Sequence, residues 1–315
     1  MKIIFMGTPD FAVGTFEALL QAGHEITLAV TQPDKPKGRG KTMQFPPVKE
    51  AAMVHGIEVF QPRRIRKPEC IEYLRKFQAD IIVVVAFGQI LPKEILDMPP
   101  KGCINVHASL LPRYRGAAPI QWAVINGEQV TGVTTMRMDE GLDTGDMIMK
   151  EEVALEQGET GGSLFGRLAQ TGAELCVRTL TAIEEGTAVY TPQDHTKATH
   201  TTMIKKELGE IDWTKPAEEL ECLIRGLNPW PSAYTKLKGK TLKIWKAYVE
   251  ESSKQAGCQE AGTIIESGRA GLIVQTGQGS LKLLEVQLEG KKRMETDAFL
   301  RGYPVENGTR LGKEW

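Results

Sequence analysis

Three polar residues could do chemistry together: Asn105, His107 and Asp143. Asn105 and His107 lie two residues apart at the end of an apolar run, and residues i and i+2 of a strand point to the same face. Asp143 follows 36 residues after His107, in a loop with a glycine two positions to either side. An amide, an imidazole and a carboxylate, with no obvious serine or cysteine nucleophile between them, indicate direct acyl transfer assisted by acid–base and oxyanion chemistry.

Each of these residues also has a purely structural explanation. Asn105 and His107 would be satisfied polar side chains at the end of a sheet. Their strand is predicted to be central, however, and ligands of such sheets bind beyond the carboxyl ends of the strands. Asp143 would form an Asx turn, as acidic residues often do in loops. Its flanking glycines, Gly141 and Gly145, imply a backbone with unusual dihedral angles, which favours the functional interpretation.

The elements that must position these residues alternate between strand and helix patterns. The β-branched run Ile81–Ala86 predicts a strand buried on both faces. This alternation predicts an α/β fold with a doubly wound, mainly parallel, Rossmann-like sheet. The turn after the first strand lacks the Gly-x-Gly-x-x-Gly pattern, so NAD binding is not expected. The expected strands are Lys2–Met6, Glu25–Thr31, Ile57–Phe60, Ile81–Ala86, Cys103–His107, Val133–Met138 and Met147–Val153, and the expected helices include Val48–His55, Glu69–Phe77, Ile120–Ile125 and Ser163–Ile183.

The pattern changes after Gly186. Tyr190–Thr202 has little periodicity, which suits a linker, and Ala217–Arg225 predicts a helix. About five short strands separated by glycine-containing turns then predict a small barrel or sandwich, of the oligonucleotide-binding type. We therefore expect a catalytic domain at residues 1–189, a linker at 190–207 and a C-terminal β-barrel domain at 208–315.

A basic segment interrupts the alternation. About sixteen residues separate the second strand from the next helix, where 2–6 are usual. Between Lys35 and Lys67 the chain has nine basic residues and two acidic ones. The segment is either a solvated surface insertion or an arm that becomes ordered on nucleic-acid phosphates. The residues that would contact those phosphates are Lys35, Lys37, Arg39 and Lys41.

Bulk properties restrict the class of protein. The chain has 315 residues, 25% of them charged, and a net charge of −1, which is typical of a globular protein of one or two domains. Its five cysteines have no spacing that indicates a disulfide framework or a zinc site. We expect reduced, mostly buried thiols in a cytoplasmic protein. There is no signal-peptide pattern, and no apolar run approaches the ~20 residues that cross a bilayer.

Several stretches resemble the methionyl-tRNA formyltransferase family: Phe5–Ala12, the insertion after Gln32, Asn105–Pro112, Gly141–Asp146 and Arg225–Pro231. The resemblance covers essentially the whole chain. It implies a formyl donor, 10-formyltetrahydrofolate, and an acceptor, the free amino group of methionine on initiator tRNA. It also implies a barrel that helps to hold the tRNA, no metal and a monomer. The donor would bind near Ser109, Leu110, Leu111 and Pro112, with Asn105, His107 and Asp143 as the catalytic residues.

The chemistry fits these residue types. An amine attacks the formyl carbon, Asn105 and protonated His107 donate to the oxyanion, and Asp143 orients or charges the imidazole. Two alternatives remain open: a formyltransferase for an amino sugar nucleotide, and a non-catalytic folate- or RNA-binding module. The basic arm at Lys35–Lys41 speaks against the first, because a small acceptor does not need it. The intact set of three polar residues speaks against the second.

Overall fold

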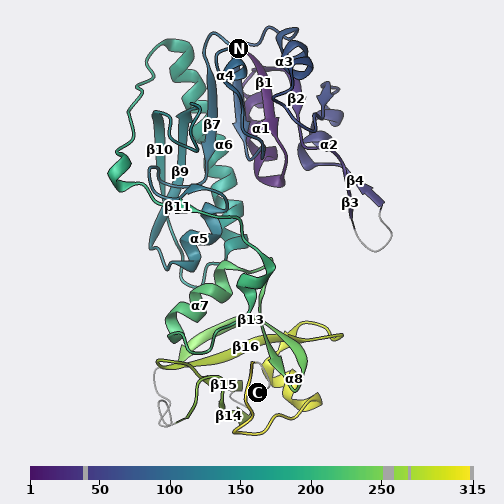
Figure 1. Cartoon of the computed structure of the whole chain (residues 1–315), viewed down its shortest axis with the longest axis vertical. Helices are drawn as coiled ribbons and strands as arrows, with labels where there is room; N and C mark the ends of the chain where they lie inside the picture. Colours follow the sequence, from purple (N-terminus) through teal and green to yellow (C-terminus); the bar gives the residue numbers. More distant parts are fainter. Residues whose placement is uncertain (38–41, 251–258, 269–270, 313–315) are drawn as a thin grey trace. The chain divides into compact units, whose positions relative to one another are not determined.

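The computed structural model of the chain describes residues 1–37, 42–250, 259–268 and 271–312. They form two compact units (Figure 1). The first unit contains residues 1–119, 130–154 and 165–201. The second contains residues 120–129, 155–164 and the chain from 202 onward. Residues 190–201, which make up much of the segment that lacks periodicity, thus fold with the first unit.

The first unit is built on a seven-stranded sheet with the order β10-β9-β7-β6-β1-β2-β5. The strands from β7 to β5 are parallel, whereas β9 and β10 are each antiparallel to their neighbours. The predicted α/β fold with a mainly parallel sheet is confirmed. The strands are β1 (Lys2–Gly7), β2 (Glu25–Val30), β5 (Val59–Phe60), β6 (Ile81–Val85), β7 (Cys103–His107), β9 (Val130–Arg137) and β10 (Met147–Ala154).

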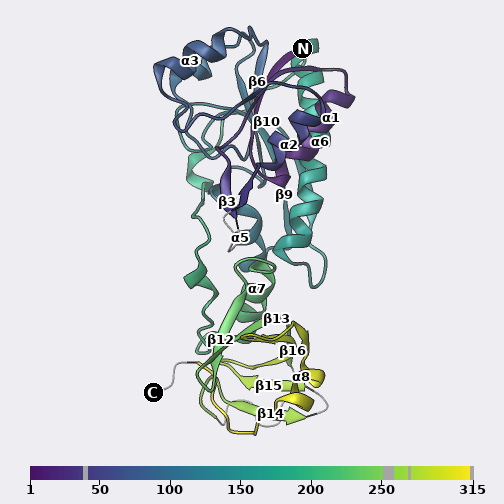
Figure 2. The ribbon, with the colours of Figure 1, turned by 90° about the vertical axis from the view of Figure 1, so that its right-hand side faces the viewer.

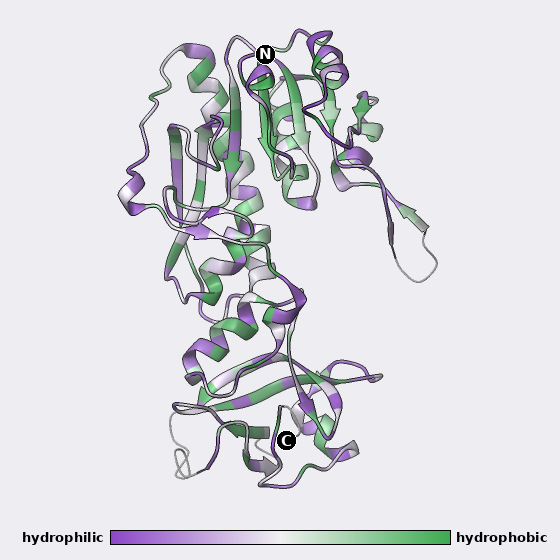
Figure 3. Cartoon of the chain, viewed as in Figure 1, coloured by the Kyte–Doolittle hydropathy of each residue, from purple (hydrophilic) through white to green (hydrophobic). Residues whose placement is uncertain are grey.

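Helices pack on both faces of this sheet, which is why its central strand β6 is apolar along its whole length (Figure 3). On one face, Ile4 of β1 belongs to a buried cluster with Leu74. On the other face, Phe5 meets the ring of Phe16 edge-on, with ring centroids 5.2 Å apart. The helices of the first unit are α1 (Asp10–Gln21), α2 (Pro47–Val54), α3 (Pro68–Arg75), α4 (Lys93–Leu96) and most of α6 (Gly161–Glu185). Helix α5 (Pro119–Ile125) belongs to the second unit from residue 120 onward.

Several short elements were not predicted. The basic segment contains a hairpin of β3 (Lys35–Lys37) and β4 (Thr42–Gln44), which extends from its unit (Figures 1 and 2). A second pair is parallel and joins β8 (Arg115–Gly116) to β11 (His200–Thr201). Two 3₁₀ turns lie at His195–Lys197 and Lys206–Gly209. These pieces span two to four residues, too few for a hydrophobic period to reveal them.

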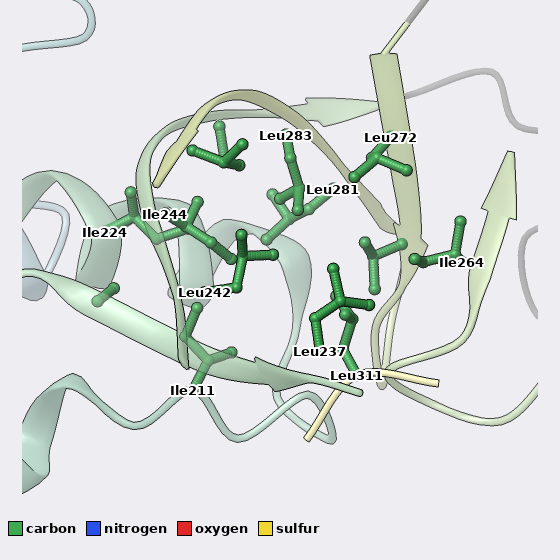
Figure 4. Close-up of a cluster of buried hydrophobic side chains, with 14 of the residues drawn as sticks. Ile211, Ile224, Leu237, Leu242, Ile244, Ile264, Leu272, Leu281, Leu283 and Leu311 are labelled. Atoms are coloured by element: carbon green, nitrogen blue, oxygen red, sulfur yellow. The ribbon is translucent and has the colours of Figure 1, made fainter. Parts of the chain in front are cut away.

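The second unit has a six-stranded antiparallel sheet with the order β12-β13-β16-β15-β14, to which β17 adds beside β16. Leucine and isoleucine side chains from these strands, together with Ile211, Ile224 and Leu311 from outside the sheet, form much of its core (Figure 4). Along β12, buried and half-buried residues alternate, as expected where one face of a strand packs on the core. The elements are α7 (Ala217–Gly226), β12 (Ala233–Leu237), β13 (Lys240–Glu250), β14 (Ile264–Gly268), β15 (Gly271–Gln275), β16 (Ser280–Leu288), β17 (Met294–Glu295) and α8 (Thr296–Gly302).

Helix α6 is the longest helix of the described residues, and it is strongly amphipathic rather than uniformly apolar. Within the described part of the chain, no helix has both the length and the apolar character that a membrane span requires.

Candidate active site

Strand β7 carries Asn105 and His107 to the carboxyl end of the sheet, with the bounds expected from the sequence. The intervening Val106 packs toward α6, where its Cγ1 lies 3.0 Å from the position that a Cβ on Gly172 would take. Because side chains alternate along a strand, Asn105 and His107 share the opposite face. The side chain of His107 is almost fully buried, at 6% exposure.

The loop between β9 and β10 brings Asp143 to the same place. Its Oδ2 lies 3.7 Å from His107 Nδ1, and its Oδ1 accepts from Asn105 Nδ2 at 3.4 Å. The main-chain N–H of Gly116 donates to Oδ2 at 2.8 Å. The structure therefore joins the three residues singled out from the sequence into one cluster, in which a carboxylate faces both the imidazole and the amide.

The Asx-turn role considered for Asp143 belongs instead to Asp139. Asp139 Oδ1 accepts from the Gly141 N–H at 3.0 Å and from the Thr144 hydroxyl at 2.6 Å. The unusual dihedral angle of the loop falls on Asp143 itself, whose φ is +53°. Gly145 serves close packing, because a Cβ there would lie 1.8 Å from the Arg137 carbonyl oxygen. The left-handed conformation of a non-glycine residue costs roughly 1 kcal/mol or more, so the surrounding contacts must sustain it.

The second nitrogen of His107 is also engaged. Nε2 lies 2.9 Å from the main-chain oxygen of Tyr114, which can only accept, so Nε2 carries a proton. Nδ1 faces the carboxylate of Asp143. Both ring nitrogens thus face oxygen acceptors, one on the main chain and one on a carboxylate.

The loop that follows β7 contains the four residues expected to hold folate. Thr134 anchors it: the threonine hydroxyl donates to the Ser109 carbonyl at 2.7 Å and accepts from the Leu111 N–H at 3.1 Å. Ser109 and Leu111 are fully buried, whereas Leu110 and Pro112 keep part of their side chains accessible. The loop is thereby fixed beside His107, with two apolar side chains at its surface.

Side chains that could form a covalent acyl intermediate are occupied or inert. The Ser109 hydroxyl donates to the Arg113 carbonyl at 2.7 Å. Cys103 lies in β7 itself, but burial raises the pKa of its thiol to about 12, and burial raises the pKa of Cys176 equally. A thiol with so high a pKa stays protonated and unreactive at neutral pH. This cluster therefore suits attack by the substrate amine itself.

The basic hairpin is described only at its base. Lys35 pairs with Gln44 and Lys37 with Thr42 across the two strands, whereas Arg39 and Lys41 lie outside the described residues.

A single lysine on α2 contacts both ends of this hairpin. Lys49 Nζ lies 2.7 Å and 2.9 Å from the carboxylate oxygens of Asp34, just before β3, and 4.0 Å from the ring centre of Phe45, just after β4. The amide oxygen of Gln61 accepts a further bond from Nζ at 2.9 Å. Hydrogen bonds from Lys49 and then Gln61 hold the pKa of Asp34 below its usual value. The pair therefore stays charged at neutral pH and is lost only in acid, as the pH falls through that lowered pKa.

Sequence reasoning missed the groups that hold the cluster together. They are the Gly116 N–H, the Tyr114 carbonyl and the side chain of Gln193, whose Nε2 donates to the main-chain oxygens of Asp143 and Gly145. Gln193 lies in the segment interpreted as a linker, where no periodicity drew attention to it. Arg115, another buried residue of this surrounding, is 3% exposed and donates to the side-chain oxygen of Gln193. Among the described residues, no group of three or more His, Cys, Asp or Glu side chains could hold a metal ion.

Comparisons with known proteins identify the family of the chain. Residues 1–180 match the family model for formyl transferases, and residues 203–304 match the model for the formyl transferase C-terminal domain. A methionyl-tRNA formyltransferase from Agathobacter rectalis is 68% identical over 98% of this chain and 99% of its own length. One from Geobacter metallireducens is 50% identical over 99% of each chain.

Solved structures share the fold at much lower identity. The sugar 3N-formyl transferase WlaRD is 17% identical with a TM-score of 0.67, covering 93% of this chain and 99% of its own. HypX from Aquifex aeolicus, solved with tetrahydrofolic acid, is 17% identical with a TM-score of 0.63. This chain spans 51% of HypX and is covered completely by the match.

Proposed function

The chain belongs to the methionyl-tRNA formyltransferase family, and on this premise we propose that it transfers the formyl group of 10-formyltetrahydrofolate to the free amino group of methionine on initiator tRNA. The product is the formylmethionyl-tRNA used to start translation. The observation that carries the proposal is the contact of Asp143 with both His107 and Asn105 in a chain 68% identical to a relative of that name.

In the proposed reaction the neutral α-amine attacks the formyl carbon and a new C–N bond forms. The carbonyl oxygen becomes an oxyanion, to which the amide of Asn105 and the N–H of protonated His107 donate. The bond from the formyl carbon to N10 of the folate then breaks. The amine loses a proton to water or to Asp143, and the leaving folate nitrogen gains one, so the proton count balances.

His107 must exchange one acceptor to take part. Its Nε2 N–H points to the Tyr114 carbonyl, and its Nδ1 faces Asp143. We propose that the formyl oxygen replaces the Tyr114 carbonyl, because the 3.7 Å contact with the Asp143 carboxylate is the one that compensates a positive charge on the ring. The negative oxyanion is a stronger acceptor than a neutral carbonyl, so the exchange is favourable as the tetrahedral intermediate forms.

The loop after β7 is the proposed folate contact. Leu110 and Pro112 supply the accessible apolar surface for the flat ring system, and Ser109 and Leu111 shape the loop through their contacts with Thr134. Tetrahydrofolate bound to HypX, which has the same fold, supports a folate donor. We also propose residues 1–189 as the catalytic domain and residues 190–207 as the linker to the C-terminal domain.

We further propose that residues 208–315 form a barrel of the oligonucleotide-binding type that contributes to tRNA binding. The antiparallel order of β12 to β16 supports this, since such barrels are built from five antiparallel strands. A monomer acting in the cytoplasm, where initiator tRNA is used, completes the proposal.

Acceptor choice is the experiment that tests this function. Labelled 10-formyltetrahydrofolate is offered with methionyl-initiator-tRNA, with free methionine and with amino sugar nucleotides, and transfer of label is followed for each. We expect transfer to the charged tRNA alone. Preferred transfer to an amino sugar nucleotide would support the alternative that the sugar formyltransferase fold relatives represent. Absence of transfer to every acceptor, with folate still bound, would indicate a non-catalytic module.

The basic hairpin leads to a prediction about tRNA use. We expect Arg39→Ala, or deletion of Lys37–Lys41, to weaken the productive use of methionyl-tRNA while folate affinity is unchanged, because an arginine fork suits phosphate. Each lost phosphate contact lowers the slope of log affinity against log salt by about 0.7–0.9. Transfer rates against tRNA concentration at several salt levels measure both effects. An arm variant with the parental rate and salt slope would make the hairpin a passive insertion.

A related prediction concerns the contacts of Lys49 with the two ends of the hairpin. Lys49→Met keeps the stem of the side chain but removes the charge that binds Asp34 and lies over Phe45. We expect the KM for methionyl-tRNA to rise about 3- to 10-fold, because a loosened arm must be ordered on binding. The KM for folate, and kcat at saturating tRNA, should equal those of the parental chain at every pH between 6 and 8. Lys93→Met, which breaks an exposed Lys93–Asp97 pair elsewhere in the unit, is the matched control.

A further inference from the structure

Gln193 holds the main chain of the loop that carries Asp143. The side chain is 5% exposed, and its Nε2 lies 2.8 Å from the carbonyl oxygen of Asp143 and 2.8 Å from that of Gly145. An amide nitrogen has two N–H groups, so both bonds form at once. Gln193 therefore binds the main chain of the loop, while the side-chain carboxylate of Asp143 faces His107.

Arg115 decides which end of the Gln193 amide faces the loop. Its Nε and Nη2 donate to Gln193 Oε1 at 3.0 Å and 2.7 Å, and Nη2 also lies 3.2 Å from His195 Nδ1. The guanidinium is 3% exposed and can only donate. In the flipped orientation the N–H groups of the amide would face the N–H groups of the buried Arg115. The amide oxygen would face two carbonyl oxygens, so neither end could form a hydrogen bond. The charge of Arg115 thus excludes the flipped orientation.

Short strand β8 connects both sides of this arrangement. Arg115 orients Gln193, and the next residue, Gly116, donates its N–H to the Asp143 carboxylate at 2.8 Å. The dipeptide Arg115-Gly116 thus contacts Asp143 in two ways. Arg115 acts on the main chain of Asp143 through Gln193, and Gly116 binds the carboxylate of Asp143 directly. Such support is needed because Asp143 has a left-handed φ of +53°, which an aspartate does not adopt without cost.

We propose that Gln193, oriented by Arg115, is a positioning residue for catalysis: it fixes the main chain of Asp143 so that its carboxylate stays facing His107. The inference rests on the proposed formyl transfer and extends it to a residue that touches neither substrate. A displacement of about 1 Å in such a group is enough to cost up to about 100-fold in rate.

Gln193→Glu is the sharpest test, because it keeps the size of the side chain and its bond to Arg115. A carboxylate cannot donate to the oxygens of Asp143 and Gly145, and it repels them. We expect kcat for methionyl-tRNA to fall at least about 10-fold while the KM values for tRNA and folate change less than about 3-fold. Gln193→Met, which loses the donor without adding charge, should show the same split.

Two controls separate positioning from loss of stability. Leu74→Ala creates a cavity in the core under α3, away from the cluster, and gives the effect of destabilisation alone. Thermal unfolding is followed for all variants. If Leu74→Ala lowers kcat as much as Gln193→Glu at an equal loss of unfolding temperature, the positioning role is overturned.

A double-mutant cycle tests whether Gln193 acts through the Asp143 carboxylate. In an Asp143→Asn background the charge to be positioned is absent, so Gln193→Glu should cost less than about 3-fold in single-turnover rate. An equal cost in both backgrounds overturns the proposal. Formyl transfer by the parental chain is measured first: its absence would contradict the proposed function, whereas a Gln193→Glu variant with parental kcat contradicts only the positioning role.

Discussion

Replacing His107 with alanine lowers turnover at least about 100-fold with little loss of tRNA affinity, and Asn105→Ala does the same, if both side chains donate to the oxyanion. Losing one such donor typically costs about 10²–10³ in turnover, since the interaction is made only as the carbonyl oxygen becomes negative. kcat and the KM for methionyl-tRNA are measured at saturating folate. The loss should appear in kcat, and near-normal turnover in either variant would remove that residue from the mechanism.

The control for the histidine variant removes a different histidine. His24 directly precedes β2, at the amino ends of the strands rather than the carboxyl end where His107 lies, with 3.3 Å between its Nδ1 and the Met1 nitrogen. His24→Ala should keep turnover within about 3-fold of the parental chain. Unfolding of His107→Ala is measured in parallel, because that variant leaves the Tyr114 carbonyl without its ring donor, at a cost of about 1–3 kcal/mol. If turnover is lowered at temperatures where the variant is still folded, the substitution affects the reaction and not the stability of the fold.

Asp143→Asn is expected to lower turnover by a similar factor. The amide keeps the shape and can still accept from the Gly116 N–H, but it lacks the negative charge that faces His107. The positive imidazolium is then no longer compensated in a largely buried site, where an opposite charge matters most. The measurement is the pH–rate profile of kcat. An unchanged profile would mean that Asp143 only shapes its turn.

The same loop offers a matched control for this substitution. Asp139→Asn makes the same chemical change four residues away, and an amide oxygen can still accept from Gly141 and Thr144. We expect turnover within about 3-fold of the parental value and no change in the pH profile. A large loss in Asp139→Asn would indicate that loop geometry, rather than the Asp143 charge, controls the rate.

Periodicity alone predicted much of the framework. The bounds of β7 agree with the expectation at both ends, and those of β6 and α6 agree within two residues. Each of these segments keeps one hydrophobic pattern, either an apolar helix face or a continuous apolar strand, over enough residues for the pattern to be recognised in the sequence. Strand alternation also required Asn105 and His107 to share a face. The motifs around them further identified the family to which the chain belongs.

Tertiary structure alone decided what surrounds these two residues. The sequence placed Asp143 in a glycine-bracketed loop, but its contact with His107 depends on how β9 and β10 return beside β7. Arg115 and Gln193 are 78 residues apart, and nothing local distinguishes a buried, paired arginine from an exposed one. Such contacts arise from packing between distant segments, whereas a local pattern reports only the burial of its own element. The sequence therefore determined the sheet and the reacting groups, and the long-range packing determined their orientation.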